Sequence, residues 1–272
     1  MLKNSTQPIA QFINTRPRER AGALTAFFLQ HSIAVYELPL LALEPLVLTD
    51  TETSYQQCLI GKEIEGKSYD TLVVISPTAA EMGLLSCGKN FIPNCPVIAV
   101  GAKTAQVLTQ VGWQVVCPTE SSNEGMMQLP ELATLKAGNR VLIWRGQGGR
   151  QLLSDDLIKR GVQVDSIAWY ERQCPHDLPE TLATLFNQLN PQRQTFLLIS
   201  SGEAYGHWQT VMDQRSEENE ASEPHPHAWQ LTDFVYLTLG ERLSNRLRQV
   251  GLDVVQIDNL NPQTVLKGIK FG

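Results

Sequence analysis

The stretch VIAVG at residues 97–101, continued by QVGWQVV at 110–116, occurs again as YLTLG at 236–240 and QVGLDVV at 249–255. The two copies stand at a constant offset of 139 positions (240 − 101). Each copy predicts a buried strand, a glycine turn, an amphipathic helix, a glycine stop and a further strand. A repeat of this length indicates a duplicated domain rather than a solenoid of short units. Two similar α/β lobes in one chain usually face each other across a cleft.

The sequence around the repeat continues the alternation of strands and helices. An apolar strand that ends in serine precedes each copy, LVVIS at 72–76 and FLLIS at 196–200. Helices are expected after most strands, one of them over about 122–132. This alternation is typical of βαβ units with right-handed crossovers. The predicted fold class is therefore α/β, with two similar domains that each have a parallel sheet flanked by helices. Further strands are predicted at 11–15, 33–39, 140–144 and 162–169.

Composition excludes several classes of protein. A net charge of −6 argues against a general nucleic-acid binder, which normally carries a basic surface. No run of about 20 apolar residues is present, so no membrane span is expected. The segment Met1–Pro8 lacks the apolar core of a signal peptide and is expected to be a short disordered tail. The five cysteines are scattered, which suits reduced thiols. We expect a cytoplasmic protein.

One polar segment has no counterpart in the other copy of the repeat. The interval from Ser200 to Gly240 is 40 residues, whereas the interval from Ser76 to Gly101 is 25. The additional residues fall in the charged stretch 213–227. We expect a mobile insertion at the surface there.

Familiar cofactor motifs are absent from the sequence. The glycines at 146–149 do not complete the dinucleotide pattern G-x-G-x-x-G, because the third glycine position holds Gln151. No phosphate-binding G-x-x-x-x-G-K-[ST] motif occurs. The histidines form no ligand set, and His225 and His227 lie in an acidic stretch that is expected to be solvated. No cofactor and no metal are expected.

A series of short motifs resembles the uroporphyrinogen-III synthase family. They are TRP at 15–17, SPTAA at 76–80, VGAKTA at 100–105, and RGQGGR at 145–150 followed by YER at 170–172. Their order and spacing fit the family from about residue 11 to residue 268. The resemblance implies an enzyme of tetrapyrrole synthesis, a cyclising lyase. It would dehydrate hydroxymethylbilane and close it to uroporphyrinogen III with inversion of ring D.

The resemblance also implies a domain arrangement. The first domain would be discontinuous, residues 1–41 plus 175–272, and residues 42–174 would form an inserted second domain. Two strands, near 38–46 and 169–174, would form a hinge beside the cleft. The partners would be hydroxymethylbilane and uroporphyrinogen III, without nucleic acid or membrane. A monomer is expected, with a transient contact with hydroxymethylbilane synthase left open.

Hydroxymethylbilane carries eight carboxylates, and its binding site needs many anion-binding positions. Six turns in the sequence follow a strand and open a helix, and so lie at the carboxyl edge of a sheet, where free N–H groups bind anions. Arginine and lysine side chains at these turns would bind carboxylates. The alternative is that the small residues only shape the loops and the charges are solvated. The candidate substrate-binding positions are Arg16, Ser76, Pro77, Thr78, Gly101, Lys103, Thr104, Ser122, Asn123, Arg145, Gly146, Gly148, Gly149, Ser200, Ser201, Gly202 and Gly240.

Tyr170 is the candidate catalytic residue. In the resembled family, a tyrosine at this place faces the cleft, where its phenol would help the substrate hydroxyl to leave. The alternative is a packed tyrosine with a structural role. Thr104 matches a family threonine, but the equivalent place in the other lobe holds Leu243, which puts a substrate role there in doubt.

A second function, binding without catalysis, is an alternative to the enzyme. A two-lobed protein that closes on a polyanionic small molecule, without catalysis, would show the same repeat and the same turns. The isomer of uroporphyrin that forms from hydroxymethylbilane distinguishes the two, since the substrate cyclises spontaneously without inversion.

Overall fold

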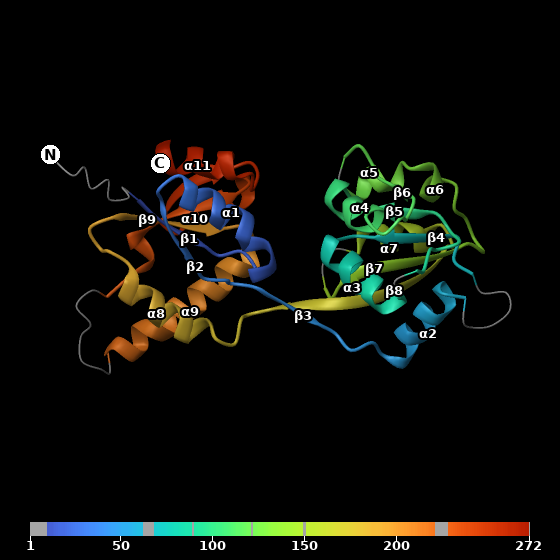
Figure 1. Ribbon diagram of the computed structural model, residues 1–272, viewed down its shortest axis with the longest axis horizontal. Coiled ribbons are helices and arrows are strands. Elements are labelled where there is room, and N and C mark those ends of the chain that lie inside the picture. The colour runs from blue at the N-terminus through green and yellow to red at the C-terminus, as the bar shows by residue number, and fades with distance from the viewer. Residues whose placement is uncertain are drawn as a thin grey trace. The chain divides into compact units, whose positions relative to one another are not determined.

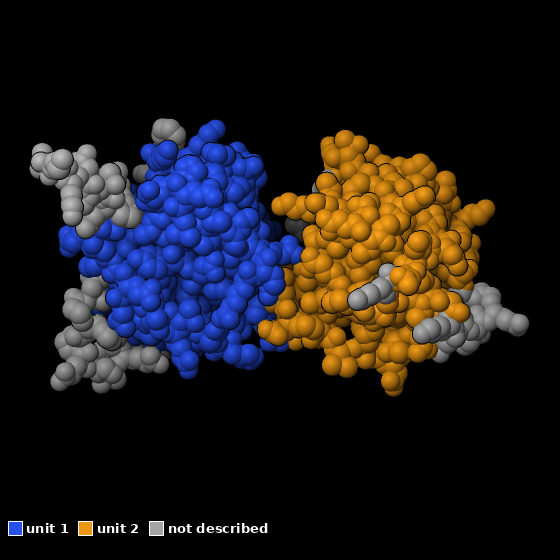
Figure 2. Space-filling view, in the orientation of Figure 1, with its two compact units in different colours: residues 1–42, 173–272 blue, residues 43–172 orange. Residues whose placement is uncertain are grey.

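The chain folds into two compact units. The computed structural model describes residues 10–61, 68–88, 90–120, 122–148, 151–220 and 228–271. Unit 1 comprises residues 1–42 and 173–272, and unit 2 comprises residues 43–172 (Figure 2). The domain boundaries expected from the sequence, at 41/42 and 174/175, differ from these by one and two residues. The tail expected over residues 1–8 lies outside the described residues.

Unit 1 contains a parallel sheet of five strands in the order β11-β10-β9-β1-β2 (Figure 1). The central strands β1, β9 and β10 consist mostly of buried residues, as expected for a sheet that is covered on both faces, whereas the edge strands β2 and β11 are partly exposed. Its elements are β1 (Ala10–Asn14), α1 (Arg18–Gln30), β2 (Ala34–Glu37), α8 (Leu178–Gln188), β9 (Gln194–Ile199), α9 (Gly202–Glu220), the 3₁₀ helix η1 (Leu231–Asp233), β10 (Phe234–Leu239), α10 (Glu241–Gln249), β11 (Asp253–Ile257) and α11 (Pro262–Phe271).

Helices cover both faces of this sheet. Figure 1 shows α1 and α11 on one face and α8 and α9 on the other. Successive strand residues point to opposite faces, so Phe12 packs with α1 and α11, whereas Ile13 packs with the helices opposite. Helix α10 contributes Leu243 and Leu247 to the core shared with α8 and α9.

Unit 2 contains a six-stranded sheet in the order β3-β8-β7-β4-β5-β6. The pairs from β8 to β6 are parallel. Helices α2, α3 and α4 pack on one face, and α5, α6 and α7 on the other. Its elements are β3 (Ala42–Pro45), α2 (Asp50–Leu59), β4 (Thr71–Val74), α3 (Pro77–Cys87), β5 (Val97–Ala99), α4 (Ala102–Thr109), β6 (Val115–Val116), α5 (Asn123–Met127), α6 (Pro130–Ala133), β7 (Arg140–Gly146), α7 (Leu152–Lys159) and β8 (Gln163–Gln173).

The sequence repeat corresponds to equivalent strands. In unit 1, β9, β10 and β11 are neighbours in the sheet, as β4, β5 and β6 are in unit 2. Beyond β9 lie β1 and β2 in unit 1, and beyond β4 lie β7, β8 and the edge strand β3 in unit 2. Successive strands are added toward one edge of the sheet and then toward the other. This change of direction falls between β1 and β9 in unit 1 and between β4 and β7 in unit 2. Ligands of open α/β sheets bind beyond the carboxyl ends of strands at such reversals.

One detail of the expected secondary structure was wrong, and another region has more helix than the sequence suggested. The single helix expected over 122–132 is two short helices, because Leu129 has an extended conformation and Pro130 begins α6. The expected surface insertion at 213–227 begins as helix, since α9 continues to Glu220. Buried Trp208 and Met212 continue the apolar face of α9, and the guanidinium of Arg215 lies 5.1 Å from the centre of the Phe186 ring. Residues 221–227 lie outside the described part of the chain.

A buried ion pair connects strands at the amino edge of the sheet in unit 2. The Arg140 guanidinium contacts the Asp165 carboxylate at 2.6 Å, and the two side chains are 14% and 7% exposed. Tyr69 donates a hydrogen bond of 3.0 Å to the same carboxylate. Arg140 also lies over the Tyr69 ring, at 4.5 Å from its centre. The pair is therefore compensated, and removing one partner would leave a buried charge.

None of the described helices is long and apolar enough to span a membrane.

Candidate active site

The carboxyl edge of the sheet in unit 2 brings four predicted positions into one row. In the strand register, Val74 pairs with Ala99 and with Trp144. Two residues further along, this register aligns Ser76 with Gly101 on one side and with Gly146 on the other. Gly146 itself pairs with Tyr170. The row therefore runs Gly101, Ser76, Gly146, Tyr170, and the reversal between β4 and β7 lies at its centre.

The side chain of Tyr170 lies across Gly146 and reaches Ser76. Its hydroxyl is 3.1 Å from Ser76 Oγ, and the residue is only 5% exposed. A Cβ atom on Gly146 would lie 2.6 Å from Cζ of Tyr170 and 3.0 Å from its hydroxyl oxygen. The tyrosine ring thus occupies the space that a side chain at position 146 would fill. Beside it, the Gln147 N–H donates to the Tyr170 carbonyl at 2.6 Å, which fixes the backbone at the bulge after Arg145.

Ser76 also forms the amino-terminal cap of α3. Its Oγ accepts the Ala79 N–H at 3.0 Å, and Pro77 begins the helix. A serine hydroxyl has one donor hydrogen and two acceptor positions. With Ala79 and Tyr170 as donors, both acceptor positions are used. The hydroxyl hydrogen of Ser76 is then left to donate to a further group at the edge of the sheet.

The remaining predicted positions in unit 2 differ in how accessible they are. Lys103 is exposed on α4, whereas Thr78 and Thr104 are 5% and 2% exposed in the first turns of α3 and α4. Ser122 Oγ accepts the Gly125 N–H at 3.0 Å and caps α5, beyond the edge strand β6; Asn123 is the first residue of that helix.

Arg145 turns back on its own loop. Its side chain donates to the carbonyls of Gly146 and Gly148. The arginine therefore holds the turn after β7, and Gly148 provides the positive φ, +73°, that this turn uses. Gly149 lies outside the described residues.

Unit 1 presents an equivalent edge. Ile13 pairs with Leu197, and Ile199 with Thr238, so the register aligns Arg16 with Ser200 and Ser201 with Gly240. Ser201 Oγ accepts the Ala204 N–H at 3.1 Å at the start of α9, next to Gly202. The reversal between β1 and β9 lies between Arg16 and the serines.

Arg16 is partly buried at this edge. Burial lowers the pKa of the Arg16 guanidinium, and the positive charge of nearby Arg20 lowers it further. Both effects would be offset by an anion at this position.

Arg246, a charged residue near this edge, was not predicted from the sequence. A Cβ on Gly202 would lie 3.4 Å from a terminal nitrogen of Arg246, which belongs to α10. No strand-end motif marks Arg246, since it lies in the middle of a helix. The signal that could have found it is the spacing of four residues from Arg242 to Arg246, which places both side chains on one face of α10.

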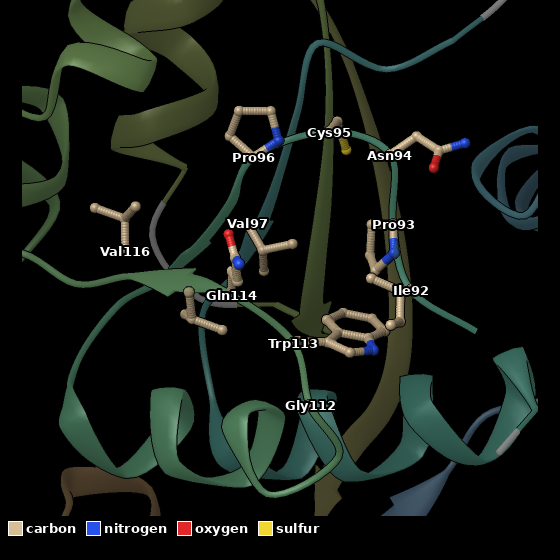
Figure 3. A pocket seen from close by; sticks show the side chains of 11 residues that line it. Ile92, Pro93, Asn94, Cys95, Pro96, Val97, Gly112, Trp113, Gln114 and Val116 are labelled. Atoms are coloured by element: carbon tan, nitrogen blue, oxygen red, sulfur yellow. The ribbon is translucent and has the colours of Figure 1, made fainter. Parts of the chain in front are cut away.

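A cavity of about 530 Å³ lies elsewhere in unit 2 (Figure 3). Its lining includes Pro93, Cys95, Val97, Trp113 and Val115. Val97 and Val115 are the first residues of β5 and β6, so the cavity lies at the amino ends of these strands, opposite the predicted row. Burial raises the pKa of the Cys95 thiol to about 11, which keeps it protonated near neutral pH. Among the described residues, no group of three or more His, Cys, Asp or Glu could hold a metal ion.

Comparisons with known proteins agree on one family. The model of the family "Uroporphyrinogen-III synthase HemD" matches residues 23–261. The chain is 27% identical to the uroporphyrinogen-III synthase of Salmonella typhimurium over 99% of both chains. It is 30% identical to that of Escherichia coli over 63% of this chain and 65% of the relative.

Solved structures show the same fold. A crystal structure of a uroporphyrinogen III synthase variant from Thermus thermophilus aligns with a TM-score of 0.55 and 14% identity, covering 96% of this chain and 97% of that one. The enzyme from Helicobacter pylori aligns with a TM-score of 0.51 and 14% identity, covering 95% and 96%.

Proposed function

The chain belongs to the uroporphyrinogen-III synthase family, and on this premise we propose that Tyr170 and Ser76 assist the loss of the substrate hydroxyl. The enzyme is a cyclising lyase of tetrapyrrole biosynthesis. It converts hydroxymethylbilane to uroporphyrinogen III with inversion of ring D and release of water. Family membership thus favours the enzyme over a two-lobed binding protein without catalysis.

The observation that carries the catalytic proposal is the hydrogen bond between Tyr170 and Ser76, at 3.1 Å. The substrate hydroxyl must leave as water, and a phenol can donate the proton. When it does, Ser76 can rotate its hydroxyl hydrogen toward the phenolate oxygen and stabilise the negative charge. The reaction releases one water and no net proton, so the proton from Tyr170 returns from the tetrapyrrole as the ring is completed.

The rest of the proposal concerns binding. We infer that the substrate carboxylates bind at the carboxyl edges of the two sheets, at the predicted turns. Backbone N–H groups at the starts of α3, α4, α9 and α10, together with Arg16 and Lys103, would supply the donors. Holding one folded conformer of the linear tetrapyrrole is the larger part of the catalytic task, because cyclisation occurs without the enzyme. We also propose a cytoplasmic monomer that meets hydroxymethylbilane synthase transiently.

Substitution of Tyr170 by phenylalanine tests the catalytic proposal. We expect Tyr170→Phe to lower the rate of type III formation by about tenfold or more, with product affinity nearly unchanged. The assay supplies enzymatically generated hydroxymethylbilane and resolves the uroporphyrin isomers. Tyr36→Phe is the matched control, since that hydroxyl bonds only the Gln188 carbonyl among the described residues, at 3.3 Å.

Two outcomes would contradict the proposal. Wild-type turnover in a Tyr170→Phe protein with an unchanged melting temperature would remove the phenol from the mechanism. Formation of type I product alone by the wild-type protein would remove the synthase activity itself.

A further inference from the structure

Arg246 extends from α10 to the start of the neighbouring helix α9. One of its terminal nitrogens comes within 3.4 Å of the position that a Cβ on Gly202 would occupy. Its guanidinium lies over the Tyr205 ring, 5.5 Å from the centre. Stacking on an aromatic face restricts the arginine without using its hydrogen-bond donors. The side chain is therefore held at the carboxyl edge of unit 1 with its donors available.

Arg246 forms no ion pair with a described residue. Among the described residues, ion pairs are formed by Arg18, Arg140 and Arg160, and Arg246 takes part in none. Arg248, on the same helix, contrasts with it, since its guanidinium donates to Asn245 Oδ1 at 3.3 Å and to the Val254 carbonyl at 3.4 Å. Arg248 thus uses its hydrogen-bond donors within unit 1, whereas no hydrogen bond from Arg246 to a described residue is seen.

A second arginine lies on the other side of the same turn. The sheet order β10-β9-β1 places α10 and Arg246 on one side of the end of β9, and Arg16 on the other. Among the described residues, the charged group that shifts the pKa of Arg16 is another cation, Arg20. Two guanidinium groups thus lie on either side of Ser200–Gly202, next to the exposed carboxylate of Glu203. Such an arrangement leaves electrostatic free energy to be gained from a bound anion.

We propose that Arg246 is a substrate-binding residue that, with Arg16, binds one carboxylate of hydroxymethylbilane at the edge of unit 1. The inference rests on the proposed binding of substrate at the two sheet edges. It gives this chain a charged substrate contact on α10. Arg246 acts on affinity, whereas Tyr170 acts on the chemical step.

The test compares Arg246→Ala, Arg246→Lys and the control Arg248→Ala. For each variant, KM and kcat for type III formation are measured at low and at high salt. Quenching of tryptophan fluorescence by uroporphyrin III gives a dissociation constant that is independent of turnover. Thermal melts report the integrity of the fold.

We expect Arg246→Ala to raise KM and the dissociation constant by about three- to tenfold, because an ion pair at an exposed site is worth little more. Its kcat should stay within about twofold of wild type. The increase of KM with salt should become shallower, since one screened charge is lost. Arg246→Lys should recover part of the affinity, and Arg248→Ala should leave KM, the dissociation constant, kcat and the salt dependence unchanged.

Three results would overturn the inference. They are an unchanged KM in folded Arg246→Ala, a lower kcat at constant KM, and an unchanged salt dependence with a lower melting temperature. The last would show that Arg246 only braces Tyr205. If Tyr170→Phe is slow while Arg246→Ala is normal, the role of Arg246 fails and the proposed chemistry stands. If both variants are normal, the placement of substrate at the sheet edges fails as well.

Discussion

Replacing Gly146 by alanine should displace the candidate catalytic side chain without touching it chemically. The φ of Gly146 is not positive, so alanine fits the backbone. The added Cβ would lie 2.6 Å from Cζ, 2.8 Å from Cε2 and 3.0 Å from the hydroxyl oxygen of Tyr170. Unstrained carbon contacts are about 3.5–4.0 Å. The ring must therefore move by about 1 Å, which is enough to break the 3.1 Å hydrogen bond to Ser76.

The size of the effect follows from what the displacement removes. Misplacement of a reacting group by about 1 Å can cost on the order of 10²-fold in rate. If Gly146→Ala acts only through Tyr170, its effect cannot exceed that of Tyr170→Phe, so we expect kcat to fall by about tenfold. Overpacking of a buried ring should also cost about 1–3 kcal/mol of stability.

A double-mutant cycle tests the reasoning. Type III formation is measured for Gly146→Ala, Tyr170→Phe and the double variant, with urea unfolding of each. We expect the double variant to be about as slow as Tyr170→Phe alone, since the two changes remove one interaction. Gly22→Ala is the control, because a Cβ there meets no atom within 4 Å in an exposed part of α1. It should stabilise the protein by up to about 1 kcal/mol without a change in rate.

Full activity of a folded Gly146→Ala protein would refute the requirement for this ring position. If the rate losses of the two single variants multiply in the double variant, the effect of Gly146→Ala does not act through Tyr170.

Two further predictions concern stability. Asp165→Asn should cost about 3–5 kcal/mol in urea unfolding, because it leaves a buried guanidinium uncompensated, whereas Asp177→Asn in an exposed pair should cost under about 1 kcal/mol; equal losses would contradict this. Burial raises the thiol pKa of Cys87 to about 12 and of Cys95 to about 11, from an ordinary value of 9.0. The contribution of each protonated thiol to the free energy of unfolding is complete below pH 9 and is lost as the pH rises toward these values, by at most roughly 1.4 kcal/mol per pH unit for each thiol. Urea midpoints measured from pH 8 upward should therefore fall less steeply in the variant with both cysteines replaced by alanine.

Much of the fold could be predicted because local signals agree with the global arrangement. Strands β4 and β9 are short apolar runs followed by serine, and a serine at this place, Ser76 or Ser201, caps the next helix. The carboxyl edge of each sheet was therefore predictable from the order of strand, small residue and helix. Helix α2 was not predicted, although Thr49 and Glu52 form a capping box that the T-x-x-E pattern announces.

The contact between Tyr170 and Ser76 could not be read from the sequence. The two residues are 94 positions apart, and they meet because β7 lies between β8 and β4 in the sheet. They also need a residue without a side chain at 146, a requirement that appears only when the register is known. Arg246 was missed for a related reason, since its importance comes from a neighbouring helix rather than from its own segment.

The insertion of unit 2 into unit 1 has a consequence for synthesis on the ribosome. Phe12 of β1 pairs with Phe196 of β9, which is translated 184 residues later (196 − 12). At 5–20 residues per second, β1 waits roughly 10–40 s for this partner. Unit 2 is contiguous, so we expect arrested chains that end near residue 180 to contain a protease-resistant core within 43–172. Until β9 emerges, β1 has an open edge that another nascent chain can pair with. The first strand to be translated is thus among the last to be protected, and the length of the inserted unit sets how long it stays exposed to aggregation.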